Sequence, residues 1–82
     1  MEDIKDILIN KGFKFGDIAK YNNIKCLIST NGNIYISILK DIVNNTYAIE
    51  YGLNFYDLNE IESNISTNKI DSVLNEILMK YI

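Results

Sequence analysis

Three asparagine-rich bends divide the middle of the chain, and they constrain its fold more than any other feature. Asparagine and glycine readily adopt the positive φ of tight turns, and the bends are Asn22-Asn23, Thr30-Asn31-Gly32 and Asn44-Asn45. Between the bends apolar and polar residues alternate with the period of two that is typical of β-strands. We therefore predict four antiparallel strands, over residues 13–21, 24–29, 33–43 and 46–53.

The alignment of these strands follows from hydrophobic matching, because a slip of one residue moves every side chain to the other face. A two-residue bend at Asn22-Asn23 places Ala19 opposite Cys26. A three-residue bend over 30–32, with Gly32 in a G1 bulge, places Cys26 opposite Ile36. A two-residue bend at Asn44-Asn45 then opposes Ile38 to Tyr51. The predicted buried face consists of Phe13, Phe15, Ala19, Ile24, Cys26, Ile28, Ile34, Ile36, Ile38, Tyr47 and Ile49.

Helical spacing appears at both ends of the chain. Apolar residues three and four apart predict a helix over residues 2–11, with Gly12 ending it in a Schellman motif. Asp57 and Glu60 have the spacing of a capping box and predict a second, short helix. Thr67 or Asn68 then caps a longer final helix. The result is one α+β domain over residues 1–82, with a four-stranded antiparallel meander and three helices packed on one face (αββββαα).

Composition limits the partners that the chain can bind. The 82 residues carry a net charge of −3, and all eight basic residues are lysines. Non-specific nucleic-acid binding depends on neutralising phosphates, and arginine is the residue that grips phosphate and guanine with paired hydrogen bonds. We therefore expect a protein partner, and composition argues against nucleic acid.

Nothing in the sequence indicates a membrane or an oxidising compartment. A membrane helix needs about 20 apolar residues, whereas the longest apolar stretches here have three, as in Cys26-Leu27-Ile28. The acidic amino terminus lacks the basic and apolar regions of a signal peptide. Cys26, the one cysteine, cannot form a disulfide within the chain. We expect a cytoplasmic protein.

Residues that carry catalysis are scarce. Histidine, the usual general acid or base near neutral pH, is absent. We interpret Cys26 as a small buried hydrophobe. The predicted registers place Asp17 and Lys40 among core-facing side chains, although a β-bulge near Gly16 or Lys40 would turn either outward. We therefore predict a protein that is not an enzyme and has no cofactor and no metal, and a small ligand sensor or enzyme around Asp17 is an alternative.

Two surfaces are candidate partner-binding sites. The segment 50–62 interleaves tyrosines with acids, a combination that suits a basic protein groove; its candidate residues are Glu50, Tyr51, Phe55, Tyr56, Asp57, Glu60 and Glu62. On the predicted sheet face without helices, Ile18, Leu27 and Tyr35 form an apolar row flanked by lysines. The competing interpretations are a helix start with acids and core aromatics for the first, and an ordinary solvated face for the second.

These surfaces lead to a function hypothesis with alternatives. Short, acidic proteins rich in isoleucine and asparagine are common in phage and mobile elements, and many of them inhibit host defence nucleoprotein complexes. We predict a small protein-binding module, an anti-CRISPR-like inhibitor that acts by steric occlusion. The alternative is a nucleic-acid-binding or regulatory module in which Tyr35 stacks on bases. The edge strands 13–21 and 46–53 could also support a homodimer.

Overall fold

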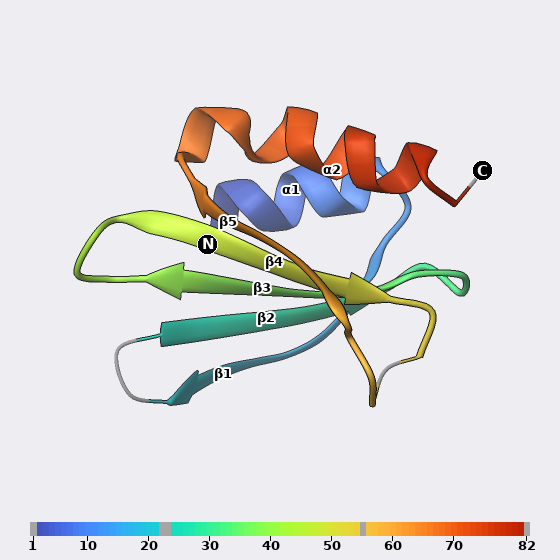
Figure 1. Ribbon diagram of the computed structural model, residues 1–82, viewed down its shortest axis with the longest axis horizontal. Coiled ribbons are helices and arrows are strands. Elements are labelled where there is room, and N and C mark those ends of the chain that lie inside the picture. The colour runs from blue at the N-terminus through green and yellow to red at the C-terminus, as the bar shows by residue number, and fades with distance from the viewer. Residues whose placement is uncertain (1, 22–23, 55, 82) are drawn as a thin grey trace.

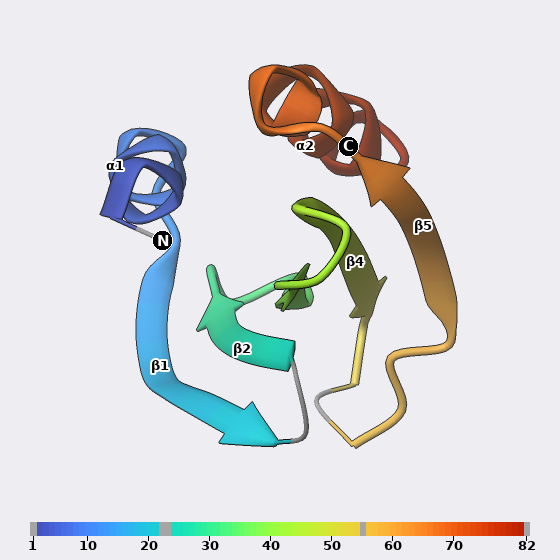
Figure 2. The same cartoon turned by 90° about the vertical axis from the view of Figure 1, so that its left-hand side faces the viewer.

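A computed structural model describes residues 2–21, 24–54 and 56–81, and for residues 2, 3, 16–21, 24 and 25 it describes the backbone alone (Figure 1). The elements in chain order are α1 (Glu2–Asn10), β1 (Lys14–Tyr21), β2 (Ile24–Thr30), β3 (Tyr35–Asp41), β4 (Thr46–Gly52), β5 (Glu60–Ile65), the 3-10 turn η1 (Thr67–Lys69) and α2 (Ile70–Met79). The strands form one antiparallel sheet in the order β1-β2-β3-β4-β5. Both helices lie on the same side of it, α1 beside β1 and α2 beside β5 (Figure 2). The predicted α+β class is confirmed, but the described chain has five strands and two α-helices.

The end of α1 follows the prediction in detail. Gly12 adopts a φ of 90°, which costs glycine little because it has no Cβ. The main-chain amide of Gly12 donates to the Ile9 carbonyl (3.0 Å), and that of Phe13 donates to the Leu8 carbonyl (3.0 Å). These are the two hydrogen bonds of a Schellman motif. They turn the chain so that Phe13 enters the core.

The register between β2 and β3 differs from the prediction by three residues. Cys26 is opposite Leu39, and Ile28 is opposite Ser37. The loop contains four residues, 31–34, because the Asn31 side chain accepts hydrogen bonds from the amides of Asn33 (3.3 Å) and Ile34 (3.1 Å) and holds a wider turn. A shift by an odd number of residues inverts the faces of one strand relative to the other.

This inversion changes the face that β2 presents to the helices. Leu27 and Ser29 are both 0% exposed, and Leu27 belongs to the core beneath the helices. Cys26 is buried on the opposite face, where its Sγ lies 2.8 Å from Ser37 Oγ. We call this helix-free side of the sheet the open face. The predicted inward orientation of Cys26 and Ile28 is therefore wrong.

The β3–β4 hairpin keeps the predicted faces but not the predicted loop length. Ile38 is opposite Ile49 rather than Tyr51, so the loop spans four residues, 42–45, and the shift of two positions preserves sidedness. The Asp41 carboxylate accepts hydrogen bonds from the Val43 amide (3.0 Å), the Asn44 amide (3.2 Å) and Asn44 Nδ2 (2.7 Å). An acidic side chain therefore sets this turn, as in an Asx turn.

Where a helix was predicted from Asp57 onward, the chain forms the strand β5. The Asp57 amide donates a hydrogen bond to the Asn54 carbonyl (3.0 Å), and beyond this bridge the chain returns along β4. The strand then pairs with the edge of β4, whose main-chain groups would otherwise lack sheet partners. The edges of the sheet are consequently β1 and β5, and the predicted edge at 46–53 is interior.

A β-bulge in β5 explains why its apolar residues, Ile61 and Ile65, have the spacing of a helix. Tyr47 is opposite Ile65 and Ile49 is opposite Glu62, so two residues, Ser63 and Asn64, share the place opposite Ala48. Asn64 has a φ of 56°. The extra residue puts Ile65 in the core and leaves Ile61 on the open face, 59% exposed.

The core lies between the sheet and the two helices. It contains α1, α2 and inward sheet residues, namely Ile4, Leu8, Phe13, Leu27, Ile34, Ile36, Ile38, Tyr47, Ile49, Tyr51, Ile65, Ile70, Leu74 and Ile77. The predicted final helix is therefore confirmed, and it buries Ile70, Leu74 and Ile77. Lys11, after α1, joins the helices through its Nζ, which lies 2.6 Å from Asp71 Oδ1 and donates to Asn75 Oδ1 (2.6 Å).

Candidate docking surfaces

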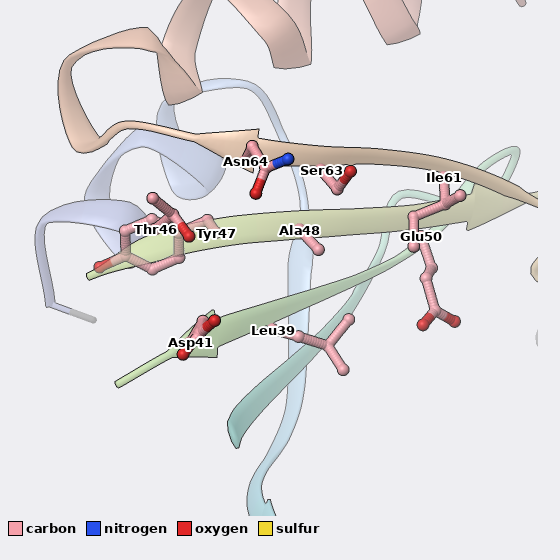
Figure 3. A pocket seen from close by; sticks show the side chains of 9 residues that line it. All are labelled: Leu39, Asp41, Thr46, Tyr47, Ala48, Glu50, Ile61, Ser63 and Asn64. Carbon is pink, nitrogen blue, oxygen red and sulfur yellow. The ribbon is translucent and has the colours of Figure 1, made fainter. Parts of the chain in front are cut away.

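The open face contains a shallow hollow of about 250 Å³ between β3, β4 and β5 (Figure 3). We call it the open-face hollow. It is lined mostly by apolar surface, and its lining residues are Leu39, Asp41, Thr46, Tyr47, Ala48, Glu50, Ile61, Ser63 and Asn64. Since no described helix covers this side of the sheet, the hollow opens to solvent.

The hollow results from one small residue, Ala48, lying among larger side chains on β3 and β5. Ala48 contributes only a methyl group at the centre, between Leu39 on β3 and the bulge at Ser63 and Asn64 on β5. The larger side chains of Leu39 and Ile61 form its walls. A depression therefore forms where a small residue stands between two larger ones.

The charges at the open-face hollow are negative. Asp41 lies at one end and Glu50 at the other, and no lysine is among the described residues that line it. Hydrogen bonds from the main-chain and side-chain amides of Asn44, with a smaller one from the Val43 amide, hold the pKa of Asp41 below its ordinary value of 3.8. The Asp41 carboxylate is therefore ionised at neutral pH.

A second surface lies where the β4–β5 connection meets the end of α2. We call the exposed side chains of Leu53, Tyr56, Asp57 and Glu60 the acidic end. Tyr56 is 93% exposed. A hollow of about 300 Å³ lies beside these residues, lined by Gly52, Leu53, Asn54, Asp57, Asn59, Glu60 and Tyr81. This segment thus exposes two large hydrophobic side chains, Leu53 and Tyr56, and two carboxylates.

Hydrogen bonds and close main-chain packing hold the connection that carries the acidic end. Besides the bond from the Asp57 amide to the Asn54 carbonyl, the Tyr56 amide donates to Asn54 Oδ1 (3.0 Å). A Cβ on Gly52 would lie 2.9 Å from the Asp57 carbonyl oxygen, closer than packed atoms approach. Glycine at position 52 therefore lets the connection pack against the end of β4.

Tyr51 is buried and so does not fit its predicted role in docking, whereas Glu62 is exposed and its role stays a prediction. Tyr51 is 1% exposed and belongs to the core, where its ring makes an edge contact with Tyr81 at 6.3 Å between centroids. Lys80 Nζ donates to Tyr51 Oη (2.7 Å) and lies 3.9 Å from Glu62 Oε1. The Tyr51 hydrogen bond first, then the charges of Glu62 and Glu60, raise the pKa of Lys80 above its ordinary 10.5.

The predicted row of Ile18, Leu27 and Tyr35 does not exist as a surface. Leu27 is in the core and is opposite Ile38, whereas Tyr35 is half-buried on the open face. The backbone of Ile18 pairs with Leu27, but its side chain, like all of Phe55, lies outside the described residues. The inverted β2–β3 register is the reason that Leu27 and Tyr35 separate.

Asp17 and Lys40, the two charged residues predicted among core-facing side chains, lie in different structural environments. Two residues of β1, Gly16 and Asp17, are opposite Ile28 alone, so β1 carries a bulge near Gly16. The Asp17 side chain lies outside the described residues. Lys40 is opposite Tyr47, and its Nζ lies 5.6 Å from the centre of that ring. A cation–π contact therefore accommodates the half-buried lysine.

The predictions included Glu50 but missed the open-face hollow around it. Leu39, Ala48 and Ile61 were not candidates because residues 57–65 were assigned to a helix. No local signal indicated the strand, because the apolar residues Leu58, Ile61 and Ile65 are three and four residues apart, as in a helix.

Comparisons with protein-family models, curated proteins and solved structures found no match for this chain. No helix in the described residues has both the length and the apolar character needed to cross a bilayer. Among the described side chains, no group of three or more from Asp, Glu and Cys lies close enough to hold a metal ion. The geometry of the two surfaces is therefore the basis for a function proposal.

Proposed function

We propose that this protein is a non-enzymatic binding module whose acidic end docks onto a positively charged protein surface. The observation that carries the proposal is the 93% exposure of Tyr56, which precedes Asp57 in the segment that also exposes Leu53 and Glu60. Large apolar side chains grouped on a small protein mark interaction sites more often than isolated ones do. Tyrosine is also enriched among the residues that dominate binding energy.

The charge and the turn geometry favour such docking. Asp57 and Glu60 attract a basic partner and increase the rate of encounter. Hydrogen bonds to Asn54 from the main-chain amides of Tyr56 and Asp57 hold the turn that carries these two residues. A preformed turn loses less conformational entropy on binding than a flexible segment does.

A partner with a basic groove normally used for nucleic acid fits this surface. Occupation of such a groove by the acidic end excludes nucleic acid through competition for the same positive charges. Inhibition of a host defence nucleoprotein complex, in the manner of an anti-CRISPR protein, is the proposed biological role. Its support is the acidic surface together with the small size of the chain and its richness in isoleucine and asparagine.

The proposal is tested by capture of partners from the native host, comparing wild-type protein with the double variant Tyr56→Ala, Glu60→Lys. We expect the wild type to retain a basic protein that excess oligonucleotide releases, and the double variant to lose it. Glu76→Lys, a charge reversal on the exposed side of α2, controls for net charge and should bind as wild type does. Equal retention by all three proteins rules out the acidic end.

The nucleic-acid alternative is separated from this proposal by a gel shift with single-stranded DNA. A phosphate-binding module binds at low salt and loses affinity steeply as salt increases. We expect no shift at low salt, because both described hollows are acidic and lack lysine in their linings. A salt-sensitive shift contradicts the docking proposal.

A further inference from the structure

Acidic and apolar side chains follow one another in a line along the open-face hollow, which is a different surface from the acidic end. Along β3 and β4 the order is Asp41, then Leu39 with Ala48, then Glu50, since Asp41 is opposite Thr46, Leu39 is opposite Ala48 and Glu50 is opposite Ser37. Figure 3 shows the Leu39 and Glu50 side chains extending to the same side of the sheet. An apolar centre therefore lies between two acidic ends.

We propose that the open-face hollow binds an extended segment of a partner protein in which basic residues at positions i and i+4 flank an apolar residue at i+2. Strand residues rise about 3.3 Å each, so the level of Glu50 is roughly 13 Å from that of Asp41. An extended peptide repeats side chains on one side every two residues. The spacing i, i+2, i+4 therefore matches the order acid, apolar floor, acid.

Each end of the hollow can receive a cation. Asp41 Oδ1 accepts two main-chain hydrogen bonds and Oδ2 accepts one from Asn44, whereas a carboxylate offers about four acceptor sites. Glu50 is half-buried on the hollow's wall. Leu39, Ala48 and Ile61 supply the apolar contact, and the 59% exposure of Ile61 leaves area for a ligand to cover.

Charge decides the occupant. An uncharged apolar ligand would fill the centre but would bring no positive charge to Asp41 or Glu50. A second copy of this chain does not supply the segment, because no two of its eight lysines are four residues apart. A segment of another protein with an apolar residue between two basic residues can contact the apolar floor and pair with both carboxylates.

This inference rests on the proposed function in one respect, which is that the partner is a positively charged protein. It concerns a different face of the molecule, because the acidic end lies at the β4–β5 connection and the open-face hollow lies along β3, β4 and β5. Variants of the two surfaces therefore separate the two proposals.

The test is fluorescence anisotropy with the labelled peptide Thr-Lys-Thr-Leu-Thr-Lys-Thr. We expect wild-type protein to bind it, and a peptide with serine in place of leucine to bind at least about tenfold more weakly, the effect of losing one buried aliphatic side chain. A peptide with glutamate in place of both lysines should not bind. Ala48→Leu fills the hollow and should also weaken binding at least about tenfold.

Two further variants make the test decisive. Glu50→Gln removes one charge from the end of the hollow without adding volume, so it gives the answer if Ala48→Leu does not fold, and we expect it to weaken binding several-fold. Tyr56→Ala should bind the peptide as wild type does. The inference is overturned by no binding, by equal binding of the leucine and serine peptides, or by equal binding to Ala48→Leu, Glu50→Gln and wild type. Partner capture that depends on Tyr56 would survive each of those results.

Discussion

Ser29 and Ser37 are the two buried polar side chains among the described residues, and they lie on opposite faces of the sheet. Ser37 Oγ lies within hydrogen-bonding distance of Cys26 Sγ (2.8 Å) on the open face. Ser29 Oγ faces the core and has no hydrogen-bond partner among the described residues. A buried hydroxyl without a partner costs about 1–3 kcal/mol of stability.

Ser29→Ala is therefore expected to stabilise the protein by about 1 kcal/mol, because it removes the hydroxyl and keeps the Cβ. Urea unfolding followed by circular dichroism measures the change. Ser37→Ala is the matched control and should give no gain, since it removes a hydroxyl that has a partner. A loss of stability in Ser29→Ala would show that this hydroxyl makes a bond with a group outside the described residues.

Gly52→Ala tests the close packing behind the acidic end. The added Cβ would lie 2.9 Å from the Asp57 carbonyl oxygen and 3.4 Å from Leu58 Cα, so main chain must move to admit it. We expect a loss of about 1–3 kcal/mol in the free energy of unfolding, the usual cost of overpacking. If thermal unfolding is unchanged, the connection at residues 57–59 packs less closely against β4 than the structure shows.

At the level of elements, the β3–β4 hairpin depends on the ionised carboxylate of Asp41. Hydrogen bonds from Asn44 and Val43 lower the pKa of Asp41 from its ordinary 3.8. A lowered pKa stabilises the turn fully above the ordinary value, and that stabilisation is lost as pH falls through the lower, folded-state value. We expect the protection of the Val43 and Asn44 amides, measured by NMR as the exchange rate relative to the intrinsic rate at the same pH, to fall as the pH drops below 3.8. Asp41→Ala should lack this protection at every pH, and equal protection profiles for the variant and the wild type would contradict this account.

The end of α2 is held to β4 by the hydrogen bond from Lys80 to Tyr51 (2.7 Å). This bond is the largest cause of the raised pKa of Lys80, so its stabilisation is complete below 10.5 and is lost as pH rises through the folded-state value. Tyr51→Phe should shift the Lys80 pKa down towards 10.5, measured by NMR titration of its side chain. Glu62→Gln, which removes a weaker contribution, should shift it less. An equal shift in both variants would contradict the assigned order of causes.

The sequence predicted correctly those features that depend on residues close together in the chain. The end of α1 is defined by Gly12 and Phe13, and the β1–β2 bend pairs Ala19 with Cys26 as predicted. The β2–β3 register failed because Cys26, Leu27 and Ile28 are consecutive apolar residues, and such a run does not indicate which face is buried. Asn31 then selected the loop length through side-chain bonds that the sequence pattern does not specify.

The pattern of apolar residues was also insufficient to predict β5, and the open-face hollow that β5 lines was therefore missed. Ile61 and Ile65 have helical spacing, but the bulge at Ser63 and Asn64 places them on opposite faces of a strand. Only the pairing with β4, in which the partners are 9 to 18 positions apart in the chain, distinguishes a strand from a helix here. Tyr56 and Asp57 are exposed although Asp57 was predicted to begin a helix, and partner binding at the acidic end stays a prediction.

For the molecule as a whole, the two sheet edges decide whether copies of the chain associate. β5 is an edge strand in which five of six residues are exposed. Its glutamates, Glu60 and Glu62, pair with the inward-facing Tyr51 and Ile49 and so share the side towards the helices. Antiparallel pairing of two β5 strands brings these like charges close together, which opposes association.

We therefore expect light scattering at neutral pH to show a monomer for the wild type, and association for the double variant Glu60→Thr, Glu62→Thr. Threonine favours a strand and removes the repulsion, so the free edge of β5 becomes available to another copy. Glu76→Thr lowers the net negative charge on α2 without changing an edge and should remain monomeric. A dimer of the wild type whose mass is unaffected by these changes would place self-association away from β5, whereas a monomeric double variant would show that the bulge at Asn64, rather than charge, protects the edge.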